Sequence, residues 1–291
     1  MDKDQEFKEL EEKSIEYISE KWKIRGLPHY QDKNFIRLNV NDEIKALSTV
    51  NDIEKYLFQI NQKRILDIGC GLGGLVTAFR LKGAEAIGFD IDADAIEICK
   101  LRAKYYGFNE NCFFVGNAES IPFPDKFFDL ITASSVLEHV GNLEKVIEEI
   151  SRVSKAAYIV FPNPLCPREA HYKIFWIPYM PKMLGKLYLK IRSFNPEFFE
   201  KHVHYVSIRK ITKLLEENRM KVENITEKKI LEKLNNPSQI EFSISHHYGF
   251  KKFIETIRKL GLSKLIAKGY ALFGPSIIVI ARDKTLQEVR E

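Results

Sequence analysis

The segment ILDIGCGLGGLV at residues 65–76 constrains the fold of this chain more than any other. A short apolar run leads directly into Gly69, Gly71, Gly73 and Gly74, and then into residues with helical periodicity. Glycine lets the chain turn tightly and brings backbone amides close to a ligand, and the following helix adds the positive end of its dipole. The segment therefore predicts a strand–turn–helix unit that binds a ligand at the carboxyl end of a parallel strand.

Apolar runs typical of strands alternate with helical periodicity between residues 64 and 162. The expected strands cover residues 64–69, 85–90, 111–116, 127–133 and 157–161. The expected helices between them cover residues 73–82, 93–106 and 143–154. Five short strands separated by helices predict an α/β fold with a parallel, doubly wound sheet.

The segments on either side of this alternation divide the chain into four expected parts. Residues 1–60 form an N-terminal helical cap, with helices at 4–23 and 42–60, the second capped by Asn41 or Asp42. Residues 61–162 form the ligand-binding core, and residues 163–206, which are interrupted by prolines, form an insert. Residues 207–291 complete the sheet and carry a helical insertion. Their expected elements are a helix at 208–218, a weaker strand at 220–226, a basic helix at 250–268 and a strand at 275–282.

Hydropathy and cysteine usage indicate a cytoplasmic protein. The longest stretch without a charged residue is 13 residues, Gly269 to Ala281. A helix that crosses a bilayer needs roughly 17–25 apolar residues, so no transmembrane segment is expected. The first residues contain no apolar signal region, so secretion is not expected either. The four cysteines form no CxxC pair, which predicts free thiols in a reducing compartment.

Charge is divided unevenly along the chain. Residues 1–162 carry 21 Lys and Arg against 27 Asp and Glu, whereas residues 163–291 carry 24 against 13. The insert mixes its basic residues with aromatic ones, namely Tyr172, Phe175, Trp176, Tyr179 and Tyr188. This composition suits a lid over an apolar acceptor that also contacts an anionic membrane surface. An RNA-binding platform and a packed excursion with a solvated basic face are the alternatives.

Two carboxylates indicate what the glycine loop binds. Gly69, Gly71 and Gly74 satisfy the GxGxxG pattern of dinucleotide sites. Asp67, however, precedes the first glycine by two residues, where it disfavours a pyrophosphate and suits a cation such as the methionine ammonium of S-adenosylmethionine. Asp90 ends the second expected strand, where a carboxylate accepts hydrogen bonds from both ribose hydroxyls. NAD sites place a carboxylate in the same way, so Asp90 indicates a nucleoside without naming it.

Four motifs in order resemble the class I S-adenosylmethionine-dependent methyltransferases, in particular the ubiquinone/menaquinone-type and general methyltransferase branch. The motifs are Asp67 to Gly73, Asp90, Gly116 to Phe123 and Phe128 to Val140. The resemblance covers about residues 60–162. It implies a mostly parallel, seven-stranded Rossmann-like sheet, with S-adenosylmethionine as cofactor and S-adenosylhomocysteine as product.

The resemblance also implies roles for individual residues. Asp67 would hold the methionine end of the cofactor, Asp90 the ribose, and the loop at 117–118 the adenine edge. Family members usually carry Asp where this chain has Asn117, whose carbonyl can still accept from the adenine amino group. With Ile91, which is placed to pack on an adenine face or in ordinary core, the expected cofactor residues are Asp67, Gly69, Cys70, Gly71, Gly73, Asp90, Ile91, Asn117, Ala118 and Ser134.

His139 is the candidate catalytic residue, because it is titratable and follows the turn after the fourth strand. A structural role in capping or packing is the alternative. Related quinone O-methyltransferases carry Glu-x-x-Glu-His at this turn, read as a metal site, but Ser135 replaces the first acid here. The other candidate ligands match no common zinc spacing; they are Cys166, His171, His202 and His204. We therefore expect no metal site.

The sequence thus predicts a methyltransferase that acts on a small-molecule or lipid-like acceptor by direct displacement. The methyl carbon of a sulfonium is already electrophilic, so the protein has to align the acceptor atom and exclude water. A general base is needed only when the acceptor must lose a proton. An NAD-type oxidoreductase, an RNA methyltransferase and a non-catalytic nucleoside-binding module are the alternatives.

Overall fold

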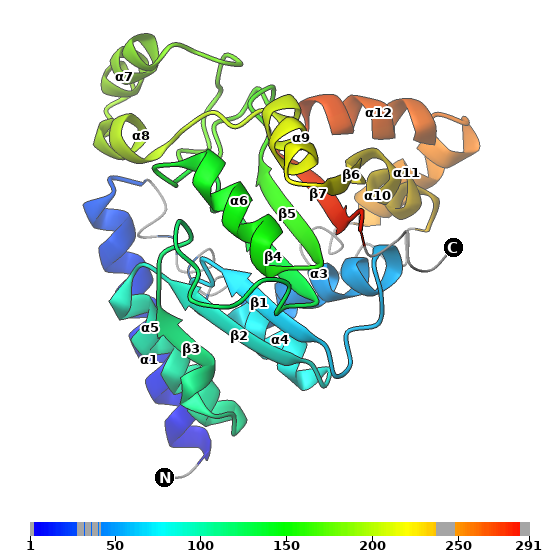
Figure 1. Ribbon diagram of the computed structural model, residues 1–291. Coiled ribbons are helices and arrows are strands. Elements are labelled where there is room, and N and C mark those ends of the chain that lie inside the picture. The colour runs from blue at the N-terminus through cyan, green and yellow to red at the C-terminus, as the bar shows by residue number, and fades with distance from the viewer. Residues whose placement is uncertain are drawn as a thin grey trace.

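A seven-stranded sheet forms the centre of the protein in the computed structural model, which describes residues 3–27, 32, 36, 40, 42–236 and 248–285 (Figure 1). The strands are β1 Arg64–Ile68, β2 Glu85–Asp90, β3 Phe113–Val115, β4 Leu130–Ser134, β5 Ala156–Pro162, β6 Met220–Asn224 and β7 Ser276–Asp283. Their order is β3-β2-β1-β4-β5-β7-β6, and among these strands only β7 runs against its neighbours. The predicted α/β fold with a doubly wound, mostly parallel sheet is confirmed.

Helices precede, separate and follow the strands. Those of the N-terminal and core parts are α1 Lys3–Ile24, α3 Asp42–Tyr56, α4 Gly74–Leu81, α5 Ala93–Tyr106 and α6 Leu143–Val153, with a short 3-10 turn η1 at Glu110–Cys112. Those of the later parts are α7 Lys182–Ile191, α8 Glu197–His202, α9 Ile208–Glu217, α10 Thr226–Asn235, α11 Tyr248–Lys259 and α12 Ser263–Phe273. The predicted cap residue Asn41 lies outside the described residues.

The two faces of the sheet are covered by different helices because successive strand residues point to opposite sides. Ile65 belongs to a buried cluster with residues of α3, α4 and α5, whereas Leu66 belongs to one with residues of α6 and α9. Both side chains are fully buried. A strand covered on both faces is buried along its length, and residues 65–68 are all buried, although Asp67 interrupts the apolar sequence.

The predicted single helix at 250–268 is wrong, because the structure divides this region into α11 and α12. Gly261 adopts a left-handed conformation with φ +69°, which ends α11. The amide of Leu262 then donates to the carbonyl of Ile257 over 3.0 Å, as at a helix C-terminus closed by a glycine. Helix α10 was not predicted. It begins at Thr226, at the start of a stretch before residue 250 to which the sequence assigned no element.

Residues 163–206 leave the sheet after β5 and form a small core of their own. Tyr172, Trp176, Leu189 and Phe199 are at most 2% exposed and pack in one cluster with Leu27, which follows α1. This insert docks on the turn after β4, where the amide of His204 donates to the carbonyl of Glu138 over 2.9 Å. The insert therefore lies beside the carboxyl end of β4. Within the described residues, no helix combines the length and the apolar character that a membrane crossing requires.

Candidate cofactor and acceptor site

The glycine loop needs its glycines because their backbones have positive φ and because two of them are closely packed. Gly69, Gly71 and Gly73 all have positive φ, at +63°, +54° and +79°. A Cβ on Gly69 would lie 2.5 Å from Val136, and one on Gly73 would lie 2.7 Å from the ring of Phe113, so both positions allow close packing. A Cβ on Gly71 would meet nothing within 4 Å. The loop is therefore packed against its neighbours at both ends and open in the middle, which is the shape that a ligand-binding cradle requires.

Asp90 and Asp67 lie on either side of this loop. The carboxylate of Asp90 accepts from the amides of Gly71 and Asp92, each over 3.0 Å, and this fixes it beside the open part of the loop. Asp67 is 4% exposed, and Thr132 of β4 donates its hydroxyl to it over 2.6 Å. Two fixed carboxylates beside a glycine loop suit a cationic group and a ribose, and disfavour a pyrophosphate.

The remaining expected cofactor residues lie at the same edge of the sheet, where β2, β3 and β4 end. Ile91 is 75% exposed, which leaves its apolar side chain available to a flat ligand. Ala118 is buried, and the side-chain oxygen of Asn117 accepts from the amide of Glu119 over 2.9 Å, so it shapes the loop itself. Ser134 ends β4 and is exposed.

Cys70 is a packing residue within this loop. Its side chain is 7% exposed. A hydrogen bond with Cys99 and burial raise the pKa of the Cys70 thiol well above its usual value. The Cys99 thiol in turn donates to the carbonyl of Gly71 over 3.1 Å. The Cys70 thiol is not set up as a nucleophile, because a nucleophilic cysteine needs a lowered pKa.

A cavity elsewhere in the molecule has no share in this site. It has a volume of about 460 Å³, lies between α1 and α5 and is lined mainly by charged side chains such as Lys13, Glu16 and Glu97. None of its lining residues belongs to the expected cofactor set.

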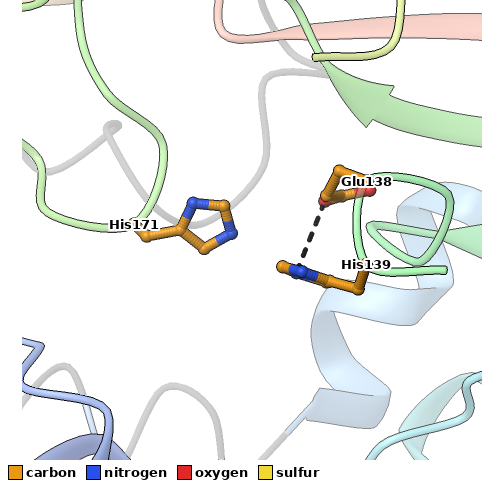
Figure 2. Close-up of side chains that lie close together, drawn as sticks. All are labelled: Glu138, His139 and His171. Atoms are coloured by element: carbon orange, nitrogen blue, oxygen red, sulfur yellow. Dashed lines mark ion pairs between the residues drawn. The ribbon is translucent and has the colours of Figure 1, made fainter. Parts of the chain in front are cut away.

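Glu138, His139 and His171 converge beside the carboxyl end of β4 (Figure 2). The first two follow β4 in the core, whereas His171 comes from the insert. Their ligand-type oxygen and nitrogen atoms all lie within 4.8 Å of one another. The rings of His139 and His171 are 5.2 Å apart, and Phe198 packs against both. The predicted catalytic residue His139 therefore belongs to a group of three, in which the sequence did not place His171.

The environment of this group shifts the pKa values of two of its members. Burial raises the pKa of Glu138 to about 7. Burial also lowers the pKa of His139 to about 4, so this histidine is neutral. The contact of 3.9 Å between them, dashed in Figure 2, therefore joins a neutral imidazole to a buried carboxyl group rather than two full charges.

The fold and the glycine loop together define an open α/β protein with a nucleoside-type site at the carboxyl ends of β1 and β2. Residues 66–161 match a family model described as a methyltransferase domain. These residues are a domain of the class I S-adenosylmethionine-dependent methyltransferases, the family that the motifs resemble.

Individual relatives agree with this assignment. The chain is 37% identical over 94 residues to the uncharacterized methyltransferase YcgJ of Bacillus subtilis, a match that covers 32% of this chain and 37% of that protein. It is 27% identical over 154 residues to a ubiquinone biosynthesis O-methyltransferase of Nitrosomonas europaea, covering 50% and 65%. The chain thus spans between about a third and two thirds of the length of these relatives.

A solved structure extends the likeness to the whole fold. The crystal structure of Bacillus YcgJ superimposes with a TM-score of 0.51 at 18% sequence identity, covering 82% of this chain and 99% of that one. At this identity the comparison concerns the fold alone. Both relatives carry the names of methyltransferases, the class that the motifs resemble.

Proposed function

We propose that this protein transfers the methyl group of S-adenosylmethionine to a small, largely apolar acceptor by direct displacement. The observation that carries the proposal is the open cradle at Gly71 with the carboxylate of Asp90 hydrogen-bonded to its amide. When bound, the cofactor supplies an electrophilic methyl carbon. The residues of this chain hold it and align the acceptor behind the carbon–sulfur bond.

Each predicted residue takes a role that its place in the structure supports. Asp90 accepts from the ribose hydroxyls, and Asp67 faces the methionine ammonium. Ile91 covers the adenine, with Asn117 and Ala118 at its edge. Ser134, at the end of β4, lies on the methyl-transfer side.

His139 is the proposed proton acceptor. Its Nδ1 lies 2.5 Å from the carbonyl of His202, which can only accept, so Nδ1 carries the proton and Nε2 keeps its lone pair. A neutral ring with a free lone pair can take a proton from an acceptor that must lose one.

The insert supports an apolar acceptor of lipid-like character. It docks on the turn after β4, beside the proposed transfer site, and presents Phe175 and Tyr179 as exposed aromatic side chains. One similar protein is named as acting in ubiquinone biosynthesis, and another, 36% identical over 128 residues, as a sterol 4-C-methyltransferase of Caenorhabditis elegans.

We infer that residues 163–206 cover the acceptor, that residues 1–60 form the cap and that residues 207–291 complete the core. The four cysteines are free thiols, in keeping with a cytoplasmic location.

The deciding experiment incubates the protein with methyl-labelled S-adenosylmethionine and a fractionated cell extract. We expect label in the small-molecule or lipid fraction with the wild-type protein, and background label with Asp90→Ala. Label in RNA or protein fractions would overturn the acceptor class. Thermal stabilisation by NAD(H) and not by S-adenosylhomocysteine would overturn the methyltransferase activity itself.

Helix α7 supports a further part of the proposal, contact with an anionic lipid surface. Met183, Leu187 and Ile191 lie four residues apart on one face of the helix and are 78%, 55% and 70% exposed. The helix contains three lysines and no acidic residue. It stands at the outer edge of the molecule (Figure 1). An exposed apolar stripe flanked by lysines is typical of helices that lie in the interface of an anionic bilayer.

Vesicle binding tests this contact. The double variant Met183→Asp/Leu187→Asp should bind vesicles of mixed phosphatidylcholine and phosphatidylglycerol at least about tenfold more weakly, because two apolar side chains no longer enter the interface. Leu81→Asp, at an exposed site on α4, is the matched control and should bind as the wild type does. Sedimentation with the vesicles measures the difference. Equal binding of the double variant and the wild type, or no binding by either, would contradict the contact.

A further inference from the structure

We propose that Glu138, His139 and His171 form a binding site for a divalent transition-metal ion such as Zn²⁺, which clasps the insert to the core. One carboxylate and two imidazoles are a ligand set that zinc accepts in proteins. Glu138 and His139 come from the turn after β4 and His171 from the insert, so the ion would join the two parts. The proposal does not depend on methyl transfer. An ion bound at Nε2 of His139 would occupy the lone pair that the proton-acceptor role requires, so the two roles of His139 exclude each other.

In both histidines, Nε2 is the ring nitrogen that remains available to an ion. The Nδ1–H of His139 donates to the carbonyl of His202, and the Nδ1–H of His171 donates to a carboxylate oxygen of Glu169 over 2.9 Å. Each ring therefore keeps its lone pair on Nε2. A metal-binding histidine typically donates its other ring N–H to a carboxylate or a backbone carbonyl, and both arrangements occur here.

Glu169 holds His171 firmly in this orientation. Its second carboxylate oxygen accepts from the backbone amides of His171 and Tyr172, over 2.6 and 2.5 Å. Glu169 is thus a buried partner that fixes the orientation of the His171 ring.

Within the described residues, Glu138 is a buried group with two carboxylate oxygens that lack hydrogen-bond partners. Its side chain is 3% exposed, and neither of its oxygens forms a hydrogen bond within the described part of the chain. Leaving a buried polar group unsatisfied is unfavourable, and more so when the group is charged. A bound cation would remove this cost.

The geometry leaves room for the ion and for one further ligand. Ligand atoms around tetrahedral zinc lie about 3.4 Å apart, given metal–ligand distances of about 2.0–2.1 Å. Nε2 of His139 lies 3.9 Å from Oε1 of Glu138, and one ligand atom from each residue lies within 4.8 Å of the others, so binding requires only a modest closing movement. A cavity of about 40 Å³ adjoins Glu138 and His171, and this is enough space for a water molecule in an open coordination position.

The chemistry of the group selects the class of ion. Imidazole nitrogens suit zinc and its neighbours in the first transition series, whereas magnesium and calcium prefer sites made wholly of oxygen. We therefore expect Zn²⁺ and Co²⁺ to bind and Mg²⁺ not to compete with them.

Metal titration of the chelator-stripped full-length protein tests the proposal. The wild type should bind one equivalent of Zn²⁺, measured by competition with a chromophoric chelator, and Co²⁺ should give the visible absorption of a four-coordinate site. His171→Ala and Glu138→Gln should each weaken Zn²⁺ binding at least tenfold. Glu169→Gln should weaken it about tenfold, as expected when an outer partner of a ligand is lost. His204→Ala is the matched control, because His204 lines the same cavity outside the group.

A second measurement tests whether the ion holds the insert to the core. Zn²⁺ should raise the melting temperature of the wild type and slow tryptic cleavage in the insert, and neither effect should occur in His171→Ala or His171→Asn. Melting curves recorded with chelator show whether each variant is folded. The absence of Zn²⁺ and Co²⁺ binding by the wild type, or wild-type affinity in both folded His171 variants, would overturn the proposal. Asp90→Ala should lose cofactor binding and keep the metal, so failure of one proposal is distinguishable from failure of the other.

Discussion

Replacing Asp90 with alanine is expected to weaken binding of S-adenosylhomocysteine by at least about 100-fold while the protein stays folded. Hydrogen bonds to a charged group contribute about 1.5–3 kcal/mol each, and Asp90 would accept two from the ribose hydroxyls. The same carboxylate holds the amide of Gly71, so its loss also loosens the loop. Isothermal titration calorimetry with S-adenosylhomocysteine measures the change.

Asp90→Asn is the companion variant that separates charge from shape. Its amide oxygen can still accept from Gly71 and from one ribose hydroxyl, so we expect an affinity between those of the wild type and the alanine variant. Melting temperatures near that of the wild type would show that both variants are folded. Unchanged affinity in a folded Asp90→Ala variant would refute the assignment of Asp90 to the ribose.

Replacing Arg102 with methionine is expected to lower the free energy of unfolding by about 3–5 kcal/mol, because it leaves the partly buried carboxylate of Glu43 without its cationic partner and with only the hydroxyl of Tyr106 donating to it. Arg102 of α5 is 1% exposed and forms a charged hydrogen bond with Glu43 of α3. It also donates to the carbonyls of Leu72 and Val40, over 2.8 and 2.6 Å. This one side chain thus joins α5, the glycine loop and the N-terminal part. Urea unfolding measures the loss.

A double substitution tests the reason for this loss. Arg102→Met/Glu43→Leu removes the stranded carboxylate as well, so it should recover part of the stability that Arg102→Met loses. Lys100→Met, also on α5 but with an exposed side chain in a surface ion pair, should leave the urea midpoint close to that of the wild type. A loss in Arg102→Met no larger than that in Lys100→Met would show that Arg102 does not connect these parts.

Much of the core and the conformation of the glycine loop were predictable from local sequence. The strand at 85–90 and the helix at 93–106 begin and end where the pattern placed them, because continuous apolar runs and helical periodicity report burial directly. The glycine loop was predictable because positive φ and close packing restrict its positions to one residue type. Asp67 was predictable because it precedes the first glycine of the loop by two residues. Asp90 was predictable because it ends the next strand along the chain.

The histidine group shows where local sequence was insufficient. Residues 138 and 139 are adjacent, but His171 is more than thirty residues away and reaches them only through the packing of the insert. The substitution of Ser135 for an acid pointed away from a metal site, and no spacing rule joins residue 139 to residue 171. The break at Gly261 was missed for a related reason, since a glycine within a helical pattern either continues or ends the helix according to what packs around it.

The sequence by itself determined the fold class, the glycine loop and the two carboxylates beside it, because each depends on residues that are close along the chain. Only the tertiary structure decided that Arg102 joins three parts of the molecule and that His171 meets Glu138 and His139. The physical reason is that buried polar groups must find partners, and the partner that each finds depends on which distant segments the folded core brings together.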